Sequence, residues 1–249
     1  MRRIFNQTML PIFLGLLAGC ASLEPFVQDF NIISIPQEQQ LGMQLEAEIA
    51  KEMTVVEDAQ LSSRVQSVGK RLVAGLLWHD FDYRFHVVKD DTPNAFTIPG
   101  GVVYVHTGLL KLVDDDSELA GVIGHEIGHA YRRHPSKALS RAYGVQYLSK
   151  LLFKKSDEQG KFRKLALDLA KGGVLSRYGR QDEYEADEAG FVLVRKAGYS
   201  TRGFLTFLGK IQKLEGTGRP IPFLSSHPPT PDRIARLESF ERGTLQASL

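Results

Sequence analysis

One five-residue segment constrains this chain more than any other. Residues 125–129 read His-Glu-Ile-Gly-His inside a run, 116–133, that is patterned as a helix. Positions four apart share a helix face, because one turn takes about 3.6 residues. His125 and His129 can therefore reach one metal ion, with Glu126 beside the water that such an ion holds. Two histidines and a glutamate at this spacing are the smallest set of side chains typical of zinc-activated hydrolysis.

The third metal ligand has to come from elsewhere in the chain. Catalytic zinc takes three protein ligands and keeps a fourth position open. The single cysteine, Cys20, belongs to the N-terminal segment, so we expect no thiolate ligand. His134 follows His129 by five residues, about 140° further round a continuous helix, and should therefore point away from the site.

A carboxylate on a second helix is the better candidate. We expect this helix over 180–196, where Glu183 and Asp187 stand four residues apart on one face. Alone, these acids would suit a solvated, ion-paired surface. Beside the histidine pair, they predict Glu183 as the third ligand. Asp187 would then accept a hydrogen bond from the ring of a ligand histidine and fix its orientation, with His125 as the expected donor.

The neighbours of these two acids fit the same arrangement. Glu185 lies about 200° from Glu183 round the helix and should face away. Ala186 and Gly190 are small enough to let this helix pack closely against the motif helix, as a shared metal site requires.

The N-terminus is patterned as a secretion signal. Two arginines follow the initial methionine, and the apolar stretch 9–17 is too short to span a bilayer comfortably. Small residues then precede Cys20, as in the bacterial lipoprotein cleavage box, where the cysteine becomes the lipidated first residue. We therefore expect a signal peptide over 1–19 and a lipidated tether over 20–33, the alternative being an ordinary signal peptide. Ala21, rather than aspartate, points to the outer membrane by resemblance to bacterial sorting rules.

Composition argues for a folded, neutral domain. Hydrophobic residues make up 43% and charged residues 24% of the 249 residues, which is ordinary for a globular protein. Without the signal, Lys+Arg falls from 31 to 29 and equals the 29 Asp+Glu. A neutral domain gives no electrostatic case for nucleic acid, so membrane contact would come from the lipid. We expect one metallopeptidase domain over 34–249.

Hydrophobic spacing and capping residues predict the elements of this domain. Three strands are expected, with a Pro-Gly-Gly turn at 99–101, over 81–88, 95–98 and 102–106. Besides the motif helix, helices are expected over 34–51, 58–77, 107–113, 136–153, 162–175, 180–196 and 200–215, and from 230 onward after a proline-rich loop at 220–229. The fold class is α+β and mostly helical, with a small sheet of three to four strands beside the motif helix.

Several motifs in register resemble the HtpX/BepA/LoiP class of zinc peptidases, which are gluzincins related to the CAAX prenyl proteases. The resemblance covers residues 35–240. Its motifs, in chain order, are Asn94-Ala95-Phe96 with the turn that follows, the histidine motif at 125–129, an ExxAD-type segment at 183–187, and Ser226-His227-Pro228 with Arg233. One departure is Gly179-Arg180, where the class usually has Ser-Arg, and it leaves the predicted ligands untouched.

The resemblance implies a zincin fold and one Zn²⁺ per chain, with a role for each matching residue. The metal ligands would be His125, His129 and Glu183, with Glu126 as general base. Asp187 would orient a ligand histidine, and Arg180 and Arg233 would organise the site by ion pairs. The residues beside the peptide-binding cleft would be Asn94, Ala95 and Phe96. An extended peptide would add to a sheet edge, either 95–98 or 102–105.

His227 has three candidate roles. It would donate to the oxyanion during catalysis, cover the zinc in a self-inhibited resting state, or simply cap the proline-rich turn. The resemblance implies a zinc endopeptidase of the bacterial envelope that cleaves unfolded or misassembled envelope proteins. It would be an outer-membrane lipoprotein facing the periplasm, with the envelope assembly machinery as a candidate partner. The alternative is a zinc-bound, self-inhibited, chaperone-like lipoprotein with little proteolysis.

Overall fold

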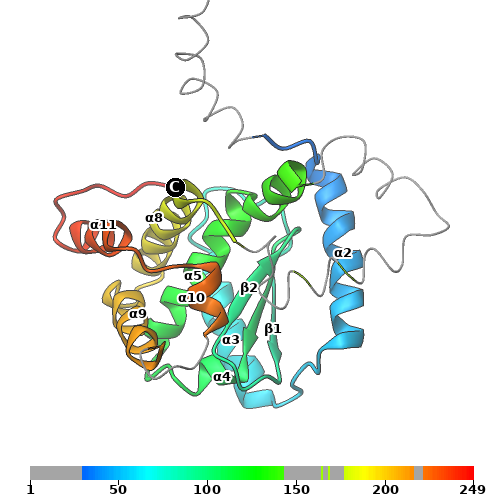
Figure 1. The fold of residues 1–249 in the computed structure, drawn as a ribbon, viewed down its shortest axis with the longest axis horizontal. Helices are drawn as coiled ribbons and strands as arrows, with labels where there is room; N and C mark the ends of the chain where they lie inside the picture. The colour runs from blue at the N-terminus through cyan, green and yellow to red at the C-terminus, as the bar shows by residue number, and fades with distance from the viewer. Residues whose placement is uncertain (1–29, 143–163, 165–167, 169–176, 216–220) are drawn as a thin grey trace, which may run out of the picture.

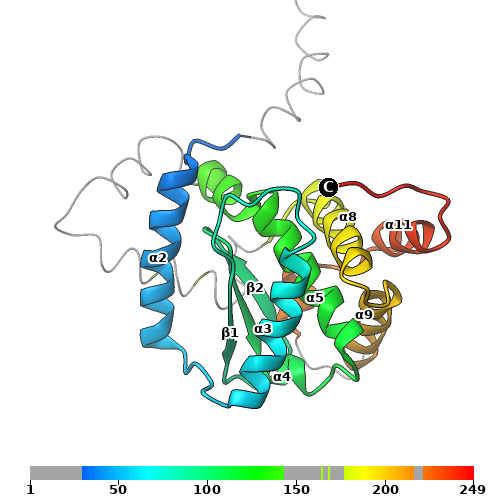
Figure 2. The same cartoon turned by 180° about the vertical axis from the view of Figure 1, so that it is seen from behind.

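In the computed structural model, residues 30–142, 164, 168, 177–215 and 221–249 are described. These residues form a small sheet between helices (Figure 1). Helix α2 lies along one face of the sheet, and α3 and α5 lie against the other; α8, α9 and α11 stack beyond α5 (Figures 1 and 2). The prediction of a mostly helical α+β fold with a small sheet is confirmed.

The elements follow the predicted order closely. The strands are β1 Arg84–Val88, β2 Ala95–Ile98 and β3 Val102–His106. The helices are α2 Ile35–Glu52, α3 Ala59–Val73, α4 Thr107–Leu110, α5 Asp116–Tyr131, α8 Arg180–Lys196, α9 Arg202–Glu215, α10 Pro222–Ser226 and α11 Pro231–Glu241.

Some expectations were wrong in their limits or lie outside the described residues. Helix α3 ends four residues short of 77, and α4 ends three residues short of 113. The proline-rich segment 220–229, expected as a loop, contains α10 with proline in its first turn. The signal peptide, Cys20 and most of the helices expected over 136–153 and 162–175 lie outside the described residues.

The sheet has the order β1-β3-β2, with β3 parallel to β1 and antiparallel to β2. Phe85 of β1 is the register partner of Val103, and Phe96 of β2 is the partner of Tyr104. The tight connection between β2 and β3 uses Gly100 and Gly101, whose positive φ angles of 85° and 80° few other residues adopt. Of the two strands considered for pairing with a peptide, β3 lies in the centre of the sheet, so only β2 is an edge strand.

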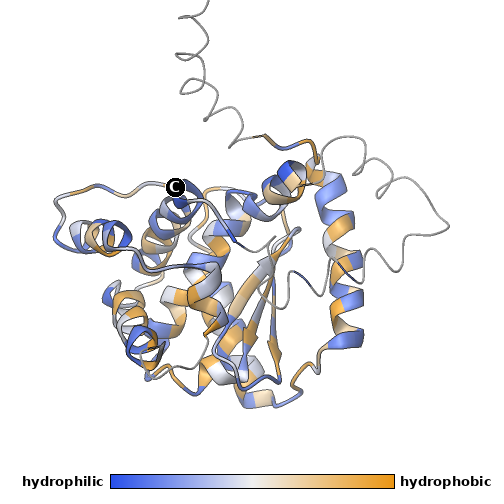
Figure 3. Cartoon of the chain, viewed as in Figure 1, coloured by the Kyte–Doolittle hydropathy of each residue, from blue (hydrophilic) through white to orange (hydrophobic). Residues whose placement is uncertain are grey.

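Strands β2 and β3 are buried on both faces, whereas β1 keeps Arg84 and His86 partly exposed. Alternate residues face α2 in one apolar cluster, and the others face α3 and α5 in a second, larger cluster. Helix α2 supplies Leu41, Leu45 and Ile49 to the first cluster. Its turns alternate between apolar and hydrophilic in Figure 3, as suits a helix with one face in solvent. The strand expected over 81–88 begins only at Arg84.

Helix α5 is the central helix of the molecule. Asp115 caps it by accepting hydrogen bonds from the backbone N–H groups of Ser117 and Glu118, as the capping spacing predicts. From Glu118 to Ala130 every residue is buried, because α5 is packed between the sheet and α8 and α9. This enclosure places the histidine motif in the interior.

The end of α5 differs from the sequence prediction. The helix ends at Tyr131, and Arg133 takes a left-handed φ of 58° that is unusual for a side chain other than glycine. Arg133 also donates from Nε to Oε2 of buried Glu38, 2.7 Å away, which holds the reversal in place. The chain becomes helical again at His134, with Pro135 in the first turn of the new helix rather than at the end of the old one.

Candidate metal centre

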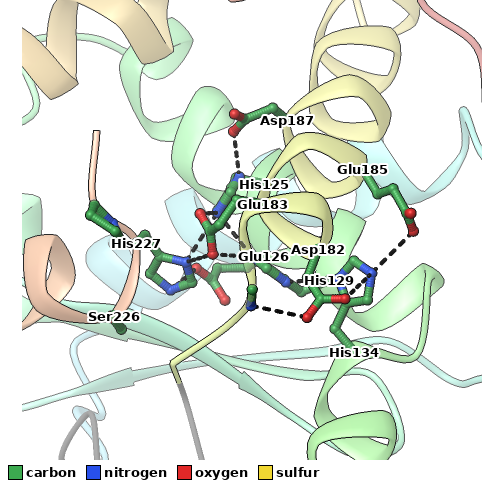
Figure 4. A network of polar contacts seen from close by, with 12 residues as sticks. His125, Glu126, His129, His134, Asp182, Glu183, Glu185, Asp187, Ser226 and His227 are labelled. Carbon is green, nitrogen blue, oxygen red and sulfur yellow. Dashed lines mark hydrogen bonds and ion pairs between the residues drawn. The ribbon is translucent and has the colours of Figure 1, made fainter. Parts of the chain in front are cut away.

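Four side chains from three parts of the chain converge in the interior (Figure 4). His125 and His129 come from α5, Glu183 from α8, and His227 follows α10. One donor atom of each lies within 4.8 Å of the others, and all four residues are buried. The structure therefore brings together the three predicted ligands and His227.

The spacing of the predicted ligand atoms suits zinc. Nε2 of His125 lies 3.0 Å from Nε2 of His129. The oxygens of Glu183 lie 3.5 Å from the first nitrogen and 3.4 Å from the second. Ligand atoms bonded at about 2.0–2.2 Å to a tetrahedral ion are about 3.3–3.6 Å apart, which the two glutamate separations match, while the two nitrogens lie slightly closer together. Two imidazoles with one carboxylate are also a donor set that catalytic zinc uses, so these residues fit the ion.

Small residues allow α5 and α8 to approach this closely. A Cβ added at Gly190 would lie 2.9 Å from both the carbonyl carbon of Gly124 and the backbone nitrogen of His125. One added at Gly128 would lie 2.6 Å from the carbonyl oxygen of Ala186. The expectation that Ala186 and Gly190 permit close packing is confirmed, and the contact is what carries Glu183 to the histidines.

The outer nitrogen of His125 has a charged partner. Nδ1 lies 2.9 Å from Oδ1 of Asp187, close enough for an ion pair although its orientation falls short of a well-formed hydrogen bond, and Nε2 faces the other donor atoms. Burial alone would lower the pKa of His125, but hydrogen bonds to Asp187 and Glu183 outweigh it and raise that pKa to about 9.

Arg233 of α11 neutralises both carboxylates of α8. Its Nη1 lies 2.5 Å from Oε2 of Glu183, and its Nη2 and Nε donate to Asp187 at 2.7 and 2.8 Å. Burial would raise the carboxyl pKa values, but nearby positive charge prevails. His227 and Arg233 hold the pKa of Glu183 well below its usual range, and Arg233 lowers that of Asp187. Both acids are therefore ionised and ready to act as ligand and acceptor.

Glu126 is buried beside the donor atoms. Neither of its carboxylate oxygens makes a well-formed hydrogen bond to any residue that the structure describes, although Oε1 lies 3.4 Å from Nε2 of His227 and the backbone N–H of Thr97 also acts on the carboxyl. Burial raises the pKa of this carboxyl. A buried carboxylate with unused acceptors and a raised pKa is suited to taking a proton at neutral pH.

His227 is the fourth residue of the cluster. Its Nδ1 lies 3.2 Å from Nε2 of His125 and 3.0 Å from Oε1 of Glu183. The ring is 1% exposed and stands at the C-terminal end of α10, whose formation the sequence did not predict. His227 therefore lies within the same group of donor atoms as the three predicted ligands.

Two residues that contact His129, namely His134 and Tyr178, were not predicted from the sequence to lie at the site. The expectation that His134 points away was wrong, because its Nδ1 lies 2.9 Å from Nδ1 of His129. Glu185, expected to face away from Glu183, does so, and it lies 3.3 Å from Nε2 of His134. Tyr178 stacks on His129 with ring centroids 4.0 Å apart. In the sequence, Tyr178 could have been identified as an aromatic residue five positions before Glu183, the first residue of the ExxAD-type segment.

The other predicted site residues lie in different surroundings. Asn94, Ala95 and Phe96 are almost fully buried, at 1%, 0% and 3% exposure, so in this structure they present little surface to a peptide. Arg180 is exposed at the start of α8, and the structure records no ion pair between it and the described groups of the site. The carboxylates that Arg180 was expected to organise are paired instead with Arg233.

The chain is similar to several known metalloproteases. The chain is 29% identical over 218 residues to the mitochondrial metalloendopeptidase OMA1 of Schizosaccharomyces pombe, covering 85% of this chain and 63% of that protein. It is 29% identical over 214 residues to the beta-barrel assembly-enhancing protease of Escherichia coli, covering 82% and 44%. It is 30% identical over 186 residues to the metalloprotease YcaL of Escherichia coli, covering 72% of each.

The chain thus spans less than two thirds of the length of the first two relatives. Within the described residues, no helix is both long and apolar enough to cross a bilayer. The family model for peptidase family M48 matches residues 59–241, which include the sheet, the paired helices α5 and α8, and His227. This chain therefore belongs to peptidase family M48.

Proposed function

We propose that this protein is a zinc-dependent endopeptidase that hydrolyses peptide bonds of unfolded or misassembled proteins of the bacterial envelope. The observation that carries the proposal is the convergence of His125, His129 and Glu183 beside Glu126 in the interior. Membership of a peptidase family supports the same reaction class.

The residues would divide the work as follows. His125, His129 and Glu183 would hold one Zn²⁺, which when bound polarises a substrate carbonyl and acidifies water. Glu126 would accept the proton of the attacking water and return it to the leaving amine, for which its unused buried oxygens suit it. Asp187 would keep the proton of His125 on Nδ1, so that Nε2 faces the metal.

An extended substrate would pair with β2. The inner side of β2 pairs with β3, and on its outer side no strand is found among the described residues. Backbone groups of an edge strand bind an extended chain with little dependence on sequence. All four residues of β2 are buried in this structure, so the edge would have to be uncovered before a substrate could pair with it. Such binding selects for unfolded segments, because only these can lie extended along an edge.

The position of His227 favours a second candidate. With Nδ1 among the donor atoms of the site, the site is in a self-inhibited arrangement, and a protein held in it would bind polypeptides while cutting few of them. Substrate would have to displace His227 before hydrolysis. Once displaced, the ring would remain near Glu126 and could donate to the developing oxyanion. An endopeptidase would alternate between the arrangement with His227 in place and the one with His227 displaced. A chaperone-like protein would remain in the arrangement with His227 in place.

The proposed location is the outer membrane, facing the periplasm. Cys20, in its lipoprotein-like box, would carry the lipid anchor. One relative is named a beta-barrel assembly-enhancing protease, and this supports the envelope assembly machinery as a candidate partner. Replacing Cys20 with serine should release the protein from the membrane fraction; unchanged membrane attachment of Cys20→Ser would contradict the anchor.

The decisive experiment on the reaction is Glu126→Gln. The variant should keep its zinc, because Glu126 is not a proposed ligand, and should lose casein cleavage by about 10²–10⁴-fold, as expected for loss of a general base. Glu118→Gln is the matched control, since Glu118 is also a buried glutamate of α5 but pairs with Lys210. Unchanged cleavage by a zinc-loaded Glu126→Gln protein would contradict the assigned role.

A test in cells separates the two candidates. If the protein acts by proteolysis, Glu126→Gln should fail to rescue an envelope defect caused by deletion of the wild-type gene. Full rescue by the Glu126→Gln variant, at wild-type abundance, would favour the chaperone-like function.

A further inference from the structure

The two proposed histidine ligands have different outer partners. His125 faces the carboxylate of Asp187 directly, with Nδ1 and Oδ1 2.9 Å apart. His129 faces another imidazole, with its Nδ1 2.9 Å from Nδ1 of His134. Both rings of this second pair are buried. A metal-binding histidine needs an acceptor for its other N–H, and none of the described carboxylates lies at Nδ1 of His129.

We propose that His134 is a positioning residue for the zinc site, accepting the Nδ1 proton of His129 and so directing Nε2 of His129 to the metal. The inference rests on the proposed function, since it takes His129 as a zinc ligand. His134 itself lies on the far side of His129 from the other donor atoms and would not touch zinc or substrate.

The proton positions follow from the geometry. Nε2 of His129 faces His125 and Glu183 and must carry a lone pair to bind a cation, so its proton belongs on Nδ1. That proton points at Nδ1 of His134, which must then be the acceptor. The proton of His134 is left on Nε2, where it can be donated.

Carboxylates stand at the far end to receive it. Nε2 of His134 lies 3.3 Å from Oε2 of Glu185 and 3.6 Å from Oδ1 of Asp182 (Figure 4). Asp182 is itself held by the guanidinium of Arg141, with Nη2 and Oδ2 3.1 Å apart. With the protons placed on Nδ1 of His129 and Nε2 of His134, each of these N–H groups has an acceptor. If His134 carried its proton on Nδ1 instead, its Nε2 lone pair would face the carboxylates of α8.

The backbone is shaped to place His134 here. On a continuous helix this ring would lie about 140° from His129. The break after Tyr131 and the left-handed residue Arg133 turn the chain back, so that His134 begins a new helix against His129. The anchor for the turn is the ion pair of Arg133 with buried Glu38. A strained, anchored turn that delivers one side chain to a ligand is expected where that side chain supports the site.

The test compares two substitutions of His134 by their zinc affinity, measured by competition with a chromophoric chelator on the full chain. In His134→Asn the side-chain carbonyl stands about where Nδ1 stood and can still accept the proton. In His134→Leu no acceptor remains at similar volume. We expect His134→Leu to bind zinc about 10- to 100-fold more weakly, and His134→Asn to stay near wild type. The Co²⁺-loaded leucine variant should also show an altered visible absorption spectrum.

A control and the contrary outcomes complete the experiment. His86 also pairs with a glutamate, Glu46, but far from the site, so His86→Leu should leave zinc affinity unchanged. Wild-type affinity in His134→Leu would overturn the inference, as would an equal loss in the asparagine and leucine variants. If the leucine variant does not fold, His134→Ala takes its place in the same comparison. Failure of the wild-type chain to bind zinc would instead overturn the proposed function.

Discussion

Nδ1 of His227 lies 3.0 Å from Oε1 of Glu183, inside the group of atoms proposed to hold zinc. The two residues are 44 positions apart, with Glu183 in α8 and His227 just after α10, yet both are buried. An active zinc site needs an open fourth position. The contact therefore links the metal centre to the short helix α10, whose displacement would expose the site.

His227→Ala should open this position. If His227 mainly covers the metal, casein cleavage should rise several-fold while zinc affinity falls, because one donor is lost. The rise should scale with the fraction of molecules that are covered in the wild type. A loss of about 10²–10³-fold with zinc retained would assign His227 to the oxyanion instead. Single-turnover cleavage on zinc-loaded protein measures the difference.

Arg233→Met should destabilise the metal-free protein strongly. The guanidinium is 1% exposed and pairs with both Glu183 and Asp187, so its removal leaves two buried negative charges. Breaking such a buried pair costs about 3–5 kcal/mol. Urea unfolding in chelator measures the loss, and added zinc should recover part of it. Arg236→Met, on the same helix but in a partly exposed pair with Glu188, should cost no more than about 1 kcal/mol. Equal, small losses in both variants would contradict the prediction.

Zinc affinity should increase with pH up to about 9. In the metal-free protein, hydrogen bonds to Asp187 and Glu183 raise the pKa of His125 to about 9 despite its burial. Below that pH the ring is protonated and must release a proton before Nε2 can bind a metal. One released proton corresponds to about tenfold in affinity per pH unit. Calorimetry in buffers of different ionisation enthalpy counts the protons.

Asp187→Asn provides the control for this pH dependence. It removes the negative charge that favours the imidazolium, so affinity should level off at a lower pH than in the wild type. Affinity that is flat between pH 6 and pH 9 in the wild-type protein would contradict a protonated His125.

Gly190→Ala should weaken both the fold and the metal site. Alanine is favoured over glycine within a helix by about 1 kcal/mol, but the new Cβ would lie 2.9 Å from the backbone of α5, and overpacking costs about 1–3 kcal/mol. Helix α8 would shift outward and carry Glu183 with it, so zinc affinity should fall as well. Gly209→Ala in α9 meets no atom within 4 Å and should gain up to about 1 kcal/mol. Equal urea midpoints for the two variants would contradict the argument.

Local patterns in the sequence were sufficient for much of the fold. The order of strands and helices, the cap at Asp115 and the Pro-Gly-Gly turn follow from residue spacing and backbone preferences, which act over a few neighbours. The same local reasoning failed at His134, because a continuous helix was assumed where Arg133 adopts a left-handed conformation. An ion pair with Glu38, 95 residues away in the chain, holds that conformation, and no local pattern could reveal it.

The sequence by itself determined which residues could bind a metal: the spacing of His125 and His129 on one helix, and that of Glu183 and Asp187 on another, are properties of the α-helix. Only the tertiary structure decided how these residues are supported and covered. Of the two arginines expected to organise the site, Arg233 pairs with both acids while Arg180 is exposed. Nδ1 of His134 lies against Nδ1 of His129, and Nδ1 of His227 lies against Glu183. The reason is physical, since these contacts join residues on separate elements, and their distances depend on how helices pack around a shared core.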